Sequence, residues 1–372
     1  MTELRLLMLV EQLRRTASGG IGTYVRGLIQ GLDSLPSDER PELELLASRP
    51  RSGGGTADLL SGLGHPVRSS SLPGPLMTRA WDYGLIRAPS GFDVVHATSL
   101  STLEPGRAAM VATVHDLLWR RVPDAYPRRG RSWHESALRT TLRRADRFVV
   151  PADVVADDLA EAGAPTEAIT VIPMGSDHLP PPDRAAATDH LRAMGIRGPF
   201  LLSVGTLEPR KNQARLIAAY GRIRDSLPDP WPLVMVGPTG WGEQVMTTTG
   251  VVLAGLVAPP VLSALYETAR LLAYVPIIEG FGLPPVEAMA FGCPVVASPL
   301  PSTAGAAFEV DPHDIDSIAE GILRVATDDQ ERTRLRSLGF SRSAELTWST
   351  IARRHAAVWE EVRHPPPRSV RG

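Results

Sequence analysis

The chain has 372 residues, enough for two or three domains with separate buried cores, which excludes a small disulfide-stapled scaffold. Its 43% hydrophobic and 22% charged residues are typical of a globular protein and exclude the disordered, collagenous and coiled-coil classes. With 39 basic and 41 acidic side chains the net charge is -2, which argues against a nucleic-acid partner. Any anion-binding site must therefore be local.

The N-terminal segment and the cysteine content together predict a cytoplasmic location. The apolar run from Leu6 to Val10 is short and lacks a small-residue cleavage site, so it predicts a first strand rather than a signal peptide. No segment contains 18 uninterrupted apolar residues, so we expect no transmembrane helix. The single cysteine, Cys293, cannot form an internal disulfide, and nothing indicates an oxidising compartment.

Apolar runs alternate with helical patterns along the chain, which predicts an α/β protein with mainly parallel sheets. In the first half we expect strands at 5–10, 42–47, 93–97, 110–115, 147–150 and 169–172, and helices at 22–34, 76–87, 131–145 and 153–162. After a proline-rich connector, 173–187, the expected strands are 199–204, 232–237, 250–254, 271–275 and 294–297. The expected helices there are 212–226, 259–269, 284–291, 314–326 and 347–362.

The repeated pattern predicts two doubly wound, Rossmann-like domains that face each other across a cleft. We place the N-terminal domain at 1–178 and the C-terminal domain at 179–346. Ligands of such folds bind outside the carboxyl ends of the strands, so the candidate residues are sought there.

The strongest signal is the nine-residue motif EGFGLPPVE, which runs from Glu279 to Glu287 after the strand at 271–275. Two prolines are tolerated in the first turn of a helix, so 280–283 is predicted to be the loop that enters it. Backbone amides at a helix N-terminus, with glycines that allow close approach, form an anion site. We expect Glu287 in the first helical turn, so that the two carboxylates flank a bound anion and accept hydrogen bonds from hydroxyl groups.

A second signal is the motif GTLEPRKN at 205–212, which also lies between a predicted strand and a predicted helix. Lys211 is the only lysine in the chain, whereas arginine supplies all of the other 38 basic residues. A compact lysine charge beside the planar fork of Arg210 suits a phosphate. The alternative is a pair of exposed basic residues at a helix that Asn212 caps.

Weaker signals lie in the N-terminal half. The sequence SGGIGT joins the first strand to the first helix and places Gly20 and Gly22 where a ligand could approach the backbone, but Val25 stands in place of a third glycine. His115 ends one strand and could bind a sugar hydroxyl or a leaving phosphate, although a strand-end histidine is often structural. His96, at the end of another strand, is weighed in the same way.

Two further patterns favour ordinary structural roles. Asp314 and Asp316 resemble a metal-binding pair but open a predicted helix, where capping explains them, so no metal is expected. The stretch 119–147 holds nine arginines against three acids, together with Trp119, Tyr126 and Trp133. It could rest on an anionic membrane, although a solvated helix face explains it somewhat better.

The motifs together resemble the retaining glycosyltransferases of family 4, which have the GT-B fold, over nearly the whole chain and most specifically in its C-terminal half. The matching segments are the E-x7-E pair in EGFGLPPVE, the donor-phosphate motif GTLEPRKN, the glycine loop GGIG, the strand-end VHD, GCPVVAS at 292–298 and DPHD at 311–314. One departure is Thr206, which stands where many relatives have a further arginine, so that Arg210 and Lys211 remain as the cationic pair.

The resemblance implies a role for each donor-side residue. Glu279 would contact the hydroxyls of the donor sugar, Glu287 the ribose, and Arg210 with Lys211 the diphosphate. The backbone at Phe281, Gly282 and Leu283 would contact sugar and phosphate, beside Gly205 at the start of the other loop. The glycines at 20 and 22 would approach the donor from the N-terminal domain, and His115 would lie at the acceptor side. The helix at 347–362 would pack back onto the N-terminal domain.

By the same resemblance, the protein is expected to be a metal-independent bacterial hexosyltransferase of polysaccharide biosynthesis that uses no cofactor. The variant GTLEPRKN mildly favours mannose and GDP-mannose as donor, and the acceptor would be a glycan or a lipid-linked glycan. Peripheral contact with the inner face of an anionic membrane would fit such an acceptor. A nucleotide-sugar epimerase and a non-catalytic nucleotide-sugar binding protein remain as alternatives.

Overall fold

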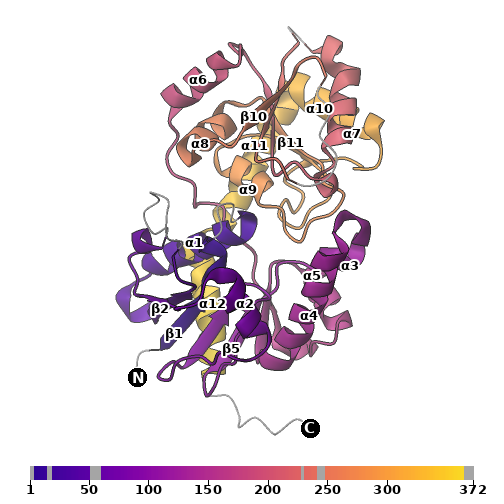
Figure 1. Cartoon of the computed structure of the whole chain (residues 1–372). Coiled ribbons are helices and arrows are strands. Elements are labelled where there is room, and N and C mark those ends of the chain that lie inside the picture. Colours follow the sequence, from indigo (N-terminus) through magenta and orange to yellow (C-terminus); the bar gives the residue numbers. More distant parts are fainter. Residues whose placement is uncertain (1–3, 15–18, 51–59, 228–229, 241–247, 364–372) are drawn as a thin grey trace. The chain divides into compact units, whose positions relative to one another are not determined.

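The computed structural model describes residues 4–14, 19–50, 60–227, 230–240 and 248–363 (Figure 1). The chain forms two compact units, one made of residues 1–175 and 348–372 and the other of residues 176–347. It therefore leaves the N-terminal unit after Gly175 and returns to it at Trp348. The boundaries predicted from the sequence were 178/179 and 346/347.

The described part of the N-terminal unit contains a seven-stranded parallel sheet in the order β3-β2-β1-β4-β5-β6-β7. Its strands are β1 (Arg5–Leu9), β2 (Glu42–Ala47), β3 (Val67–Ser69), β4 (Val94–Ala97), β5 (Ala109–Thr113), β6 (Arg147–Val150) and β7 (Ile169–Val171). The central strands β4 and β5 consist wholly of buried residues, as expected for parallel strands covered on both faces. The short edge strand β3 was not predicted, because three residues with one apolar side chain give no recognisable pattern.

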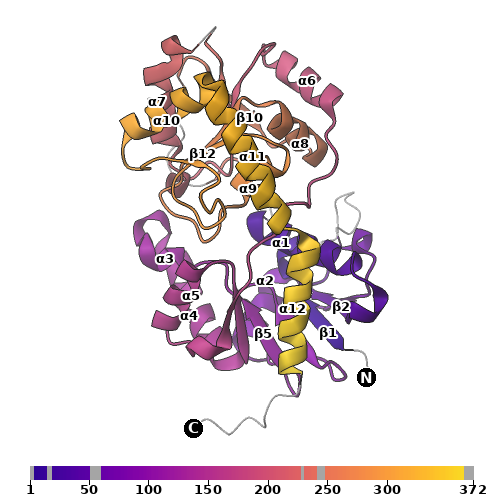
Figure 2. The same ribbon diagram turned by 180° about the vertical axis from the view of Figure 1, so that it is seen from behind.

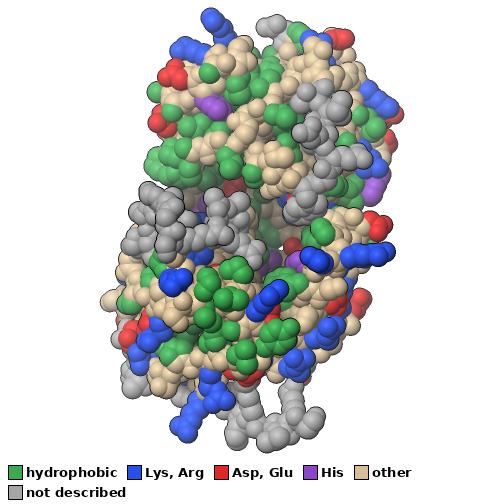
Figure 3. All heavy atoms as spheres, in the orientation of Figure 1, with side chains coloured by type: hydrophobic (Ala, Val, Ile, Leu, Met, Phe, Trp, Pro, Cys, Tyr) green, Lys and Arg blue, Asp and Glu red, His purple; other side chains and the backbone are tan. Residues whose placement is uncertain are grey.

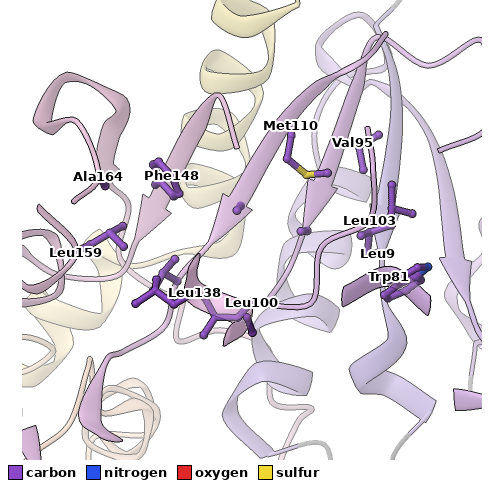
Figure 4. Close-up of a cluster of buried hydrophobic side chains, with 14 of the residues drawn as sticks. Leu9, Trp81, Val95, Leu100, Leu103, Met110, Leu138, Phe148, Leu159 and Ala164 are labelled. Atoms are coloured by element: carbon purple, nitrogen blue, oxygen red, sulfur yellow. The ribbon is translucent and has the colours of Figure 1, made fainter. Parts of the chain in front are cut away.

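Helices cover both faces of this sheet. They are α1 (Gly19–Asp33), α2 (Gly74–Asp82), α3 (Leu118–Arg121), α4 (Arg128–Arg144), α5 (Asp153–Glu161) and α12 (Trp348–Val362). Helix α2 ends five residues before the predicted end at 87. A core cluster that includes Leu9, Trp81 and Phe148 packs against the sheet (Figure 4).

The last described helix, α12, belongs to the N-terminal unit and lies along its sheet beside α1 (Figure 2). Glycines on α1 allow this contact, because a Cβ atom added to Gly27 would lie 2.0 Å from the ring of Trp348, and one added to Gly31 would lie 2.2 Å from the carbonyl oxygen of that tryptophan. Gly175, the last residue before the chain leaves the unit, meets the same ring. Helix α12 therefore packs on the unit through the indole ring of Trp348, which contacts backbone at Gly27 and Gly175.

The described part of the C-terminal unit contains a six-stranded parallel sheet in the order β10-β9-β8-β11-β12-β13. Its strands are β8 (Leu201–Val204), β9 (Leu233–Val236), β10 (Val251–Gly255), β11 (Leu271–Tyr274), β12 (Val295–Ala297) and β13 (Phe308–Glu309). Its helices are α6 (Arg184–Ala193), α7 (Gln213–Ile223), α8 (Pro259–Thr268), α9 (Leu283–Ala290), α10 (Ile315–Thr327) and α11 (Asp329–Glu345).

Two of these helices were missed by the sequence analysis. Helix α6 begins inside the segment taken as connector, where Asp183 accepts a hydrogen bond from the amide of Ala186 and caps it. Helix α11 spans 17 residues but buries only Leu335, Gly339 and Ser343, so it carries no continuous apolar stripe.

Both sheets have the strand order of a Rossmann fold, which confirms the predicted fold class of two doubly wound parallel-sheet units. In each unit the order reverses between two central strands, β1 and β4 in the first and β8 and β11 in the second. Within the described ranges, no helix combines the length and the apolar character of a membrane span.

Candidate functional site

The candidate site of the C-terminal unit lies at the carboxyl ends of β8 and β11, where the strand order reverses. Gly205 follows β8 and begins a loop that continues through a 3-10 turn at Pro209–Lys211 into α7. The loop after β11 leads through Glu279 into α9. The amide of Ile277 donates to the carbonyl of Arg210 at 2.9 Å and joins the two loops. The two strongest sequence motifs therefore meet at one place.

Four charged side chains from these loops form a single cluster. One oxygen of Glu279, Oε1, contacts Lys211 Nζ at 2.6 Å and Arg210 Nη1 at 2.7 Å. The other side of the Arg210 guanidinium reaches Glu208 Oε1 through Nη2 at 2.6 Å. Lys211 Nζ also donates to the hydroxyl of Tyr274 at 2.7 Å. The two cations predicted to bind phosphate are therefore each paired with a carboxylate inside the protein.

The two carboxylates of this cluster have opposite pKa shifts. Burial raises the pKa of Glu208 above its ordinary value, although Arg210 and Lys211 oppose that shift. Burial acts in the same direction on Glu279, but Lys211 and Arg210 outweigh it and hold the pKa of Glu279 below its usual value. Burial also lowers the pKa of Lys211, while Glu279 opposes it. Glu279 therefore keeps its negative charge to a lower pH than Glu208 does.

Asn212 does not cap α7 with its side chain, contrary to the structural alternative considered for it. Its backbone has a φ of 63°, in the left-handed region, and its side-chain amide donates to the carbonyls of Val275 at 2.9 Å and Pro312 at 2.7 Å. An asparagine tolerates this conformation better than most residues. The hydrogen bond to Val275 fixes the loop at 205–212 against the loop that follows β11.

Helix α9 begins one residue earlier than predicted, at the end of the loop that contains Gly280 and Gly282. Gly282 is the N-cap, with a φ of 90° that favours glycine, and Leu283 is already helical. Because Pro284 and Pro285 have no N–H, the unpaired amides at this helix start are concentrated at Gly282 and Leu283. Phe281 and Leu283 bury their side chains, so that these residues can offer only backbone to a ligand.

Glu287 lies in the second turn of α9, not in the first as predicted, and it is not a simple partner of the helix dipole. Its Oε2 accepts a hydrogen bond from the hydroxyl of Tyr266 at 2.8 Å, and its Oε1 lies 3.1 Å from His178 Nε2. Burial and the carboxylate of Glu287 raise the pKa of Tyr266 well above its ordinary value, so this tyrosine remains a donor. The second carboxylate of the motif is thus held in one orientation by two neighbours.

A buried hydroxyl lies beside the helix start. Ser302 is fully buried, and its Oγ has no hydrogen-bond partner among the residues that the structure describes. A Cβ atom added to Gly282 would lie 3.2 Å from this oxygen. The Ser302 hydroxyl can therefore form a hydrogen bond with a ligand group that binds over Gly282.

The predicted residues of the N-terminal half belong to the other unit. Gly20 and Gly22 lie in the first turn of α1 rather than in a loop before it, which corrects the prediction, and Ser18 lies outside the described residues. His115 follows β5, and its Nε2 lies 2.9 Å from the carbonyl of Thr98, so Nε2 carries the proton. Burial lowers the pKa of His115 despite the opposing contributions of Thr98 and Asp116, so the ring is neutral near pH 7.

His96 is structural. Its Nε2 lies 2.8 Å from the hydroxyl of Thr113, which in turn lies 2.8 Å from the hydroxyl of Tyr24, and the latter reaches His355 Nε2 at 2.8 Å. Because His355 Nδ1 faces the carbonyl of Ile351 and must donate to it, its Nε2 accepts from Tyr24. The chain of donors therefore runs from His96 to α12 and ties this helix to the sheet.

Four residues that shape the site were not predicted from the sequence, namely Glu208, Tyr266, Tyr274 and His178. Glu208 lies within the motif GTLEPRKN. It would have been found if a partner had been sought for each charged residue of that motif. Tyr274 ends β11, and the rule that selected strand-end histidines would have selected it. Tyr266 and His178 carry no local signal.

The aspartates at 314 and 316 cap α10, as predicted: Asp314 Oδ1 accepts a hydrogen bond from the amide of Asp316 at 2.9 Å. Across the described residues, no three histidine, cysteine or acidic side chains are arranged to hold a metal ion.

Two family models match the chain. The model described as Glycosyltransferase Family 4 matches residues 18–178, and the model described as Glycosyl transferases group 1 matches residues 195–341. The second match contains both motifs of the candidate site.

Curated relatives resemble the chain at modest identity. It is 30% identical over 254 residues to the O-antigen chain mannosyltransferase B of Escherichia coli, an alignment that covers 64% of this chain and 66% of that protein. It is 31% identical over 179 residues to the serotype-specific mannosyltransferase WbdA of Escherichia coli, of which it spans only 21%. It is 28% identical over 302 residues to the MMP alpha-(1->4)-mannosyltransferase of Mycolicibacterium hassiacum, covering 73% and 71% of the two chains.

Solved structures share the fold over nearly the full length. Anabaena HepE in complex with UDP-glucose superposes with a TM-score of 0.72 at 19% identity, over 97% of this chain and 100% of that one. The sucrose-phosphate synthase of Thermosynechococcus elongatus gives a TM-score of 0.74 at 19% identity, over 97% and 99%.

Proposed function

The chain belongs to the family 4 glycosyltransferases and has their GT-B fold, and from this premise we propose that it transfers a hexosyl group from a nucleotide sugar to an acceptor hydroxyl with retention of anomeric configuration. The hexose is mannose and the donor is GDP-mannose. The acceptor is a glycan or a lipid-linked glycan. The three relatives described above bear the name mannosyltransferase, which supports the choice of sugar.

The observation that carries the proposal is the cluster of Arg210, Lys211 and Glu279 beside the start of α9. A departing nucleoside diphosphate needs cations and backbone donors around its developing charge. Arg210 and Lys211 supply the cations, and the amides of Gly282 and Leu283 supply the donors. Glu279 holds both cations in place, so that the diphosphate meets a preorganised site.

Glu279 acts in donor binding and not as a nucleophile. Its Oε1 is shared between Lys211 and Arg210, which leaves Oε2 to accept hydrogen bonds from the hydroxyls of the donor sugar. Retention then follows from attack on the same face that the diphosphate leaves, while the sugar carries oxocarbenium-like charge. The depressed pKa of Glu279 keeps a negative charge beside that centre.

Glu287 binds the ribose hydroxyls. Tyr266 donates to one oxygen of Glu287 and His178 lies against the other. The carboxylate is therefore held in one orientation, and its remaining lone pairs can accept hydrogen bonds from the ribose. His115, neutral and held by Thr98, contacts the sugar at the acceptor side.

Contact with an anionic membrane is part of the proposal, but its residues differ from those suggested by the sequence. Within 119–147, Arg120 pairs with Glu135 and Arg121 with Asp158. Arg144 pairs with Glu104 and Arg147 with Glu361, so four of the nine arginines in this stretch are compensated inside the unit.

Helix α2 and the loop after it offer a better surface. Leu76, Tyr83 and Leu85 are 53%, 78% and 76% exposed, and apolar side chains gather over this region with basic ones beside them (Figure 3). Exposed Arg79 and Arg87 lie on the same segment. Apolar and basic groups together suit an anionic bilayer surface. Failure to sediment with anionic vesicles at low salt would remove this part of the proposal.

The test is a product assay with purified protein, GDP-mannose or another nucleotide sugar, and a glycan acceptor. We expect release of the nucleoside diphosphate together with a glycosylated product whose NMR coupling reports the same anomeric configuration as the donor. Glu279→Gln should abolish product, whereas Glu309→Gln, an exposed acid on β13 of the same unit, should leave turnover unchanged.

The same assay separates the alternatives. An isomerised donor without release of nucleoside diphosphate would identify an epimerase. Tight binding of a nucleoside diphosphate without turnover on any acceptor would identify a binding protein.

A further inference from the structure

A second concave site lies at the opposite end of the C-terminal sheet. A pocket of about 470 Å³ opens at the amino ends of β8 and β11, between α6, α8 and the first half of α11. Phe200 immediately precedes β8 and Ala269 and Arg270 precede β11, and all three line the pocket. Its volume is within the range of small-molecule sites.

The lining of this pocket is strongly basic although the whole chain has a net charge of -2. It contains one acid, Glu267. The basic lining residues are Arg184, Arg192, Arg197, Arg270, Arg332 and Arg336.

Acids and helix ends compensate only part of this charge. Arg184 pairs with Glu267, Asp329 is shared between Arg270 and Arg332, and Arg192 has only a 3.8 Å contact with Asp189. The C-terminal ends of α6 and α8 each add a partial negative charge of about half a unit. About two positive charges then remain without compensation.

Two of the guanidinium groups are available to a ligand. Arg197 has no hydrogen bond or ion pair with any residue that the structure describes, and it is exposed at the rim. Arg336 donates through its Nε to the carbonyl of Gly292 at 2.9 Å, a contact that does not use its terminal amino groups. Planar guanidinium groups of this kind bind phosphate through two parallel hydrogen bonds.

Like charges are crowded at the pocket. Burial lowers the pKa of Arg270, and the neighbouring Arg332 lowers it further, although Asp329 opposes both effects. A bound anion would relieve this repulsion. The floor is apolar, with Ile196, Phe200 and Ala187 buried, so that a ligand can place carbon atoms there while its charges reach the arginines.

We propose that this pocket is a second anion site, which binds a small phosphorylated molecule carrying two or more negative charges. It is separate from the donor site, because the four residues of β8 extend roughly 13 Å between Phe200 in the pocket and Gly205 at the candidate active site. Similarly, β11 separates Arg270 from Tyr274. The inference does not depend on the proposed transferase activity.

The test uses inorganic pyrophosphate as the probe, in calorimetric titrations at low ionic strength. Because pyrophosphate would also bind Arg210 and Lys211, the titrations are made with wild type and with Lys211→Ala. We expect Lys211→Ala to retain one binding event. Adding Arg192→Ala and Arg197→Ala to that variant should weaken this event by about tenfold or more, since charged hydrogen bonds are lost.

A matched control removes two arginines that do not line the pocket. Arg334 lies on α11 between the two lining arginines of that helix but pairs with Glu331, and Arg222 lies on α7. Arg222→Ala with Arg334→Ala in the Lys211→Ala background changes the net charge equally and should leave binding intact. Equal weakening in both sets would reduce the effect to general charge and overturn the proposal, as would a Lys211→Ala variant that binds no pyrophosphate.

The two proposals fail in different ways. If Lys211→Ala binds pyrophosphate as wild type does, in number of sites and affinity, the donor site is wrong while the second site stands. If the Arg192 and Arg197 substitutions change nothing, the second site is wrong while the donor site stands.

Discussion

Replacing Glu208 by glutamine should tighten the binding of a nucleoside diphosphate by about 30-fold. Glutamine keeps an oxygen that can accept from Arg210 Nη2, so the guanidinium retains its orientation while the negative charge disappears. The Glu208 side chain is only 2% exposed, so water screens its charge weakly. The substitution therefore removes repulsion between a buried carboxylate and the charge of the nearest phosphate group.

The magnitude follows from the geometry of the cluster. A phosphate on the far side of the Arg210 guanidinium would lie ~8 Å from the Glu208 carboxylate, and two unit charges at that separation repel each other by about 2 kcal/mol at an effective dielectric constant of about 20. That energy corresponds to roughly 30-fold in Kd.

The effect should depend on pH. Burial already raises the pKa of Glu208, and a bound diphosphate would raise it further, so binding to the wild type takes up a proton. Affinity of the wild type should therefore fall as the pH rises through the pKa of Glu208, whereas the affinity of Glu208→Gln should lack this dependence. Below that pKa the two proteins should bind alike.

The assay is isothermal titration calorimetry with GDP and UDP at several pH values, each in two buffers of different ionisation enthalpy to count protons. Glu309→Gln serves as the control for removing one acid from the same unit. The reasoning is refuted if Glu208→Gln binds no more tightly than wild type at neutral pH, or if wild-type binding takes up no proton.

Three other substitutions test separate parts of the structure. Lys211→Ala should lower kcat/KM by roughly 10- to 150-fold, the equivalent of a charged hydrogen bond of about 1.5–3 kcal/mol, and unchanged steady-state kinetics in a folded variant would disprove its assignment. Burial lowers the pKa of His355 to about 4, so the folded protein prefers the neutral ring, and stability should be lost as the pH falls from 6.5 to 4. Urea unfolding should show that the free energy of unfolding of His355→Gln falls less than that of the wild type between pH 6.5 and 4, by up to about 3 kcal/mol. An equal fall in the two proteins would contradict this prediction. Gly27→Ala should lower the free energy of unfolding by about 1–3 kcal/mol through its clash with Trp348, although alanine is the better helix former, whereas Gly221→Ala, with open space around it, should raise the melting temperature. Equal melting temperatures for the two glycine variants would argue against that packing.

The strand framework was predictable because buried parallel strands leave continuous apolar runs. The segment from Leu271 to Tyr274 is one such run, and its end located the EGFGLPPVE loop correctly. Helix α11 was not predictable, since its arginines and acids pair with one another on the surface and few of its positions face the core. The start of α9 was predicted one residue too late, because prolines are tolerated at several first-turn positions and only the φ of Gly282 identifies the N-cap.

The candidate site was only half visible in the sequence. Motif spacing identified Glu279, Lys211 and Arg210, because each lies in a segment between a predicted strand and a predicted helix. It could not reveal that one oxygen of Glu279 joins both cations, because that contact links loops 68 residues apart in the chain. Glu287 was expected in the first helical turn as a ligand of the ribose, and nothing in the motif indicated that Tyr266 and His178 reach it from other elements.

The return of the chain to its first unit sets an order for folding during synthesis. Residues 176–347 form one continuous unit, which can fold as soon as it has been made. Until α12 has left the ribosome, the N-terminal unit lacks the indole ring that packs on Gly27 and Gly175 and the acceptor of the Tyr24 hydroxyl. Multidomain chains generally fold their N-terminal domain first, but here the domain that begins first is completed last. A chain that stops before Trp348 should therefore leave a folded C-terminal unit attached to an unfinished N-terminal one.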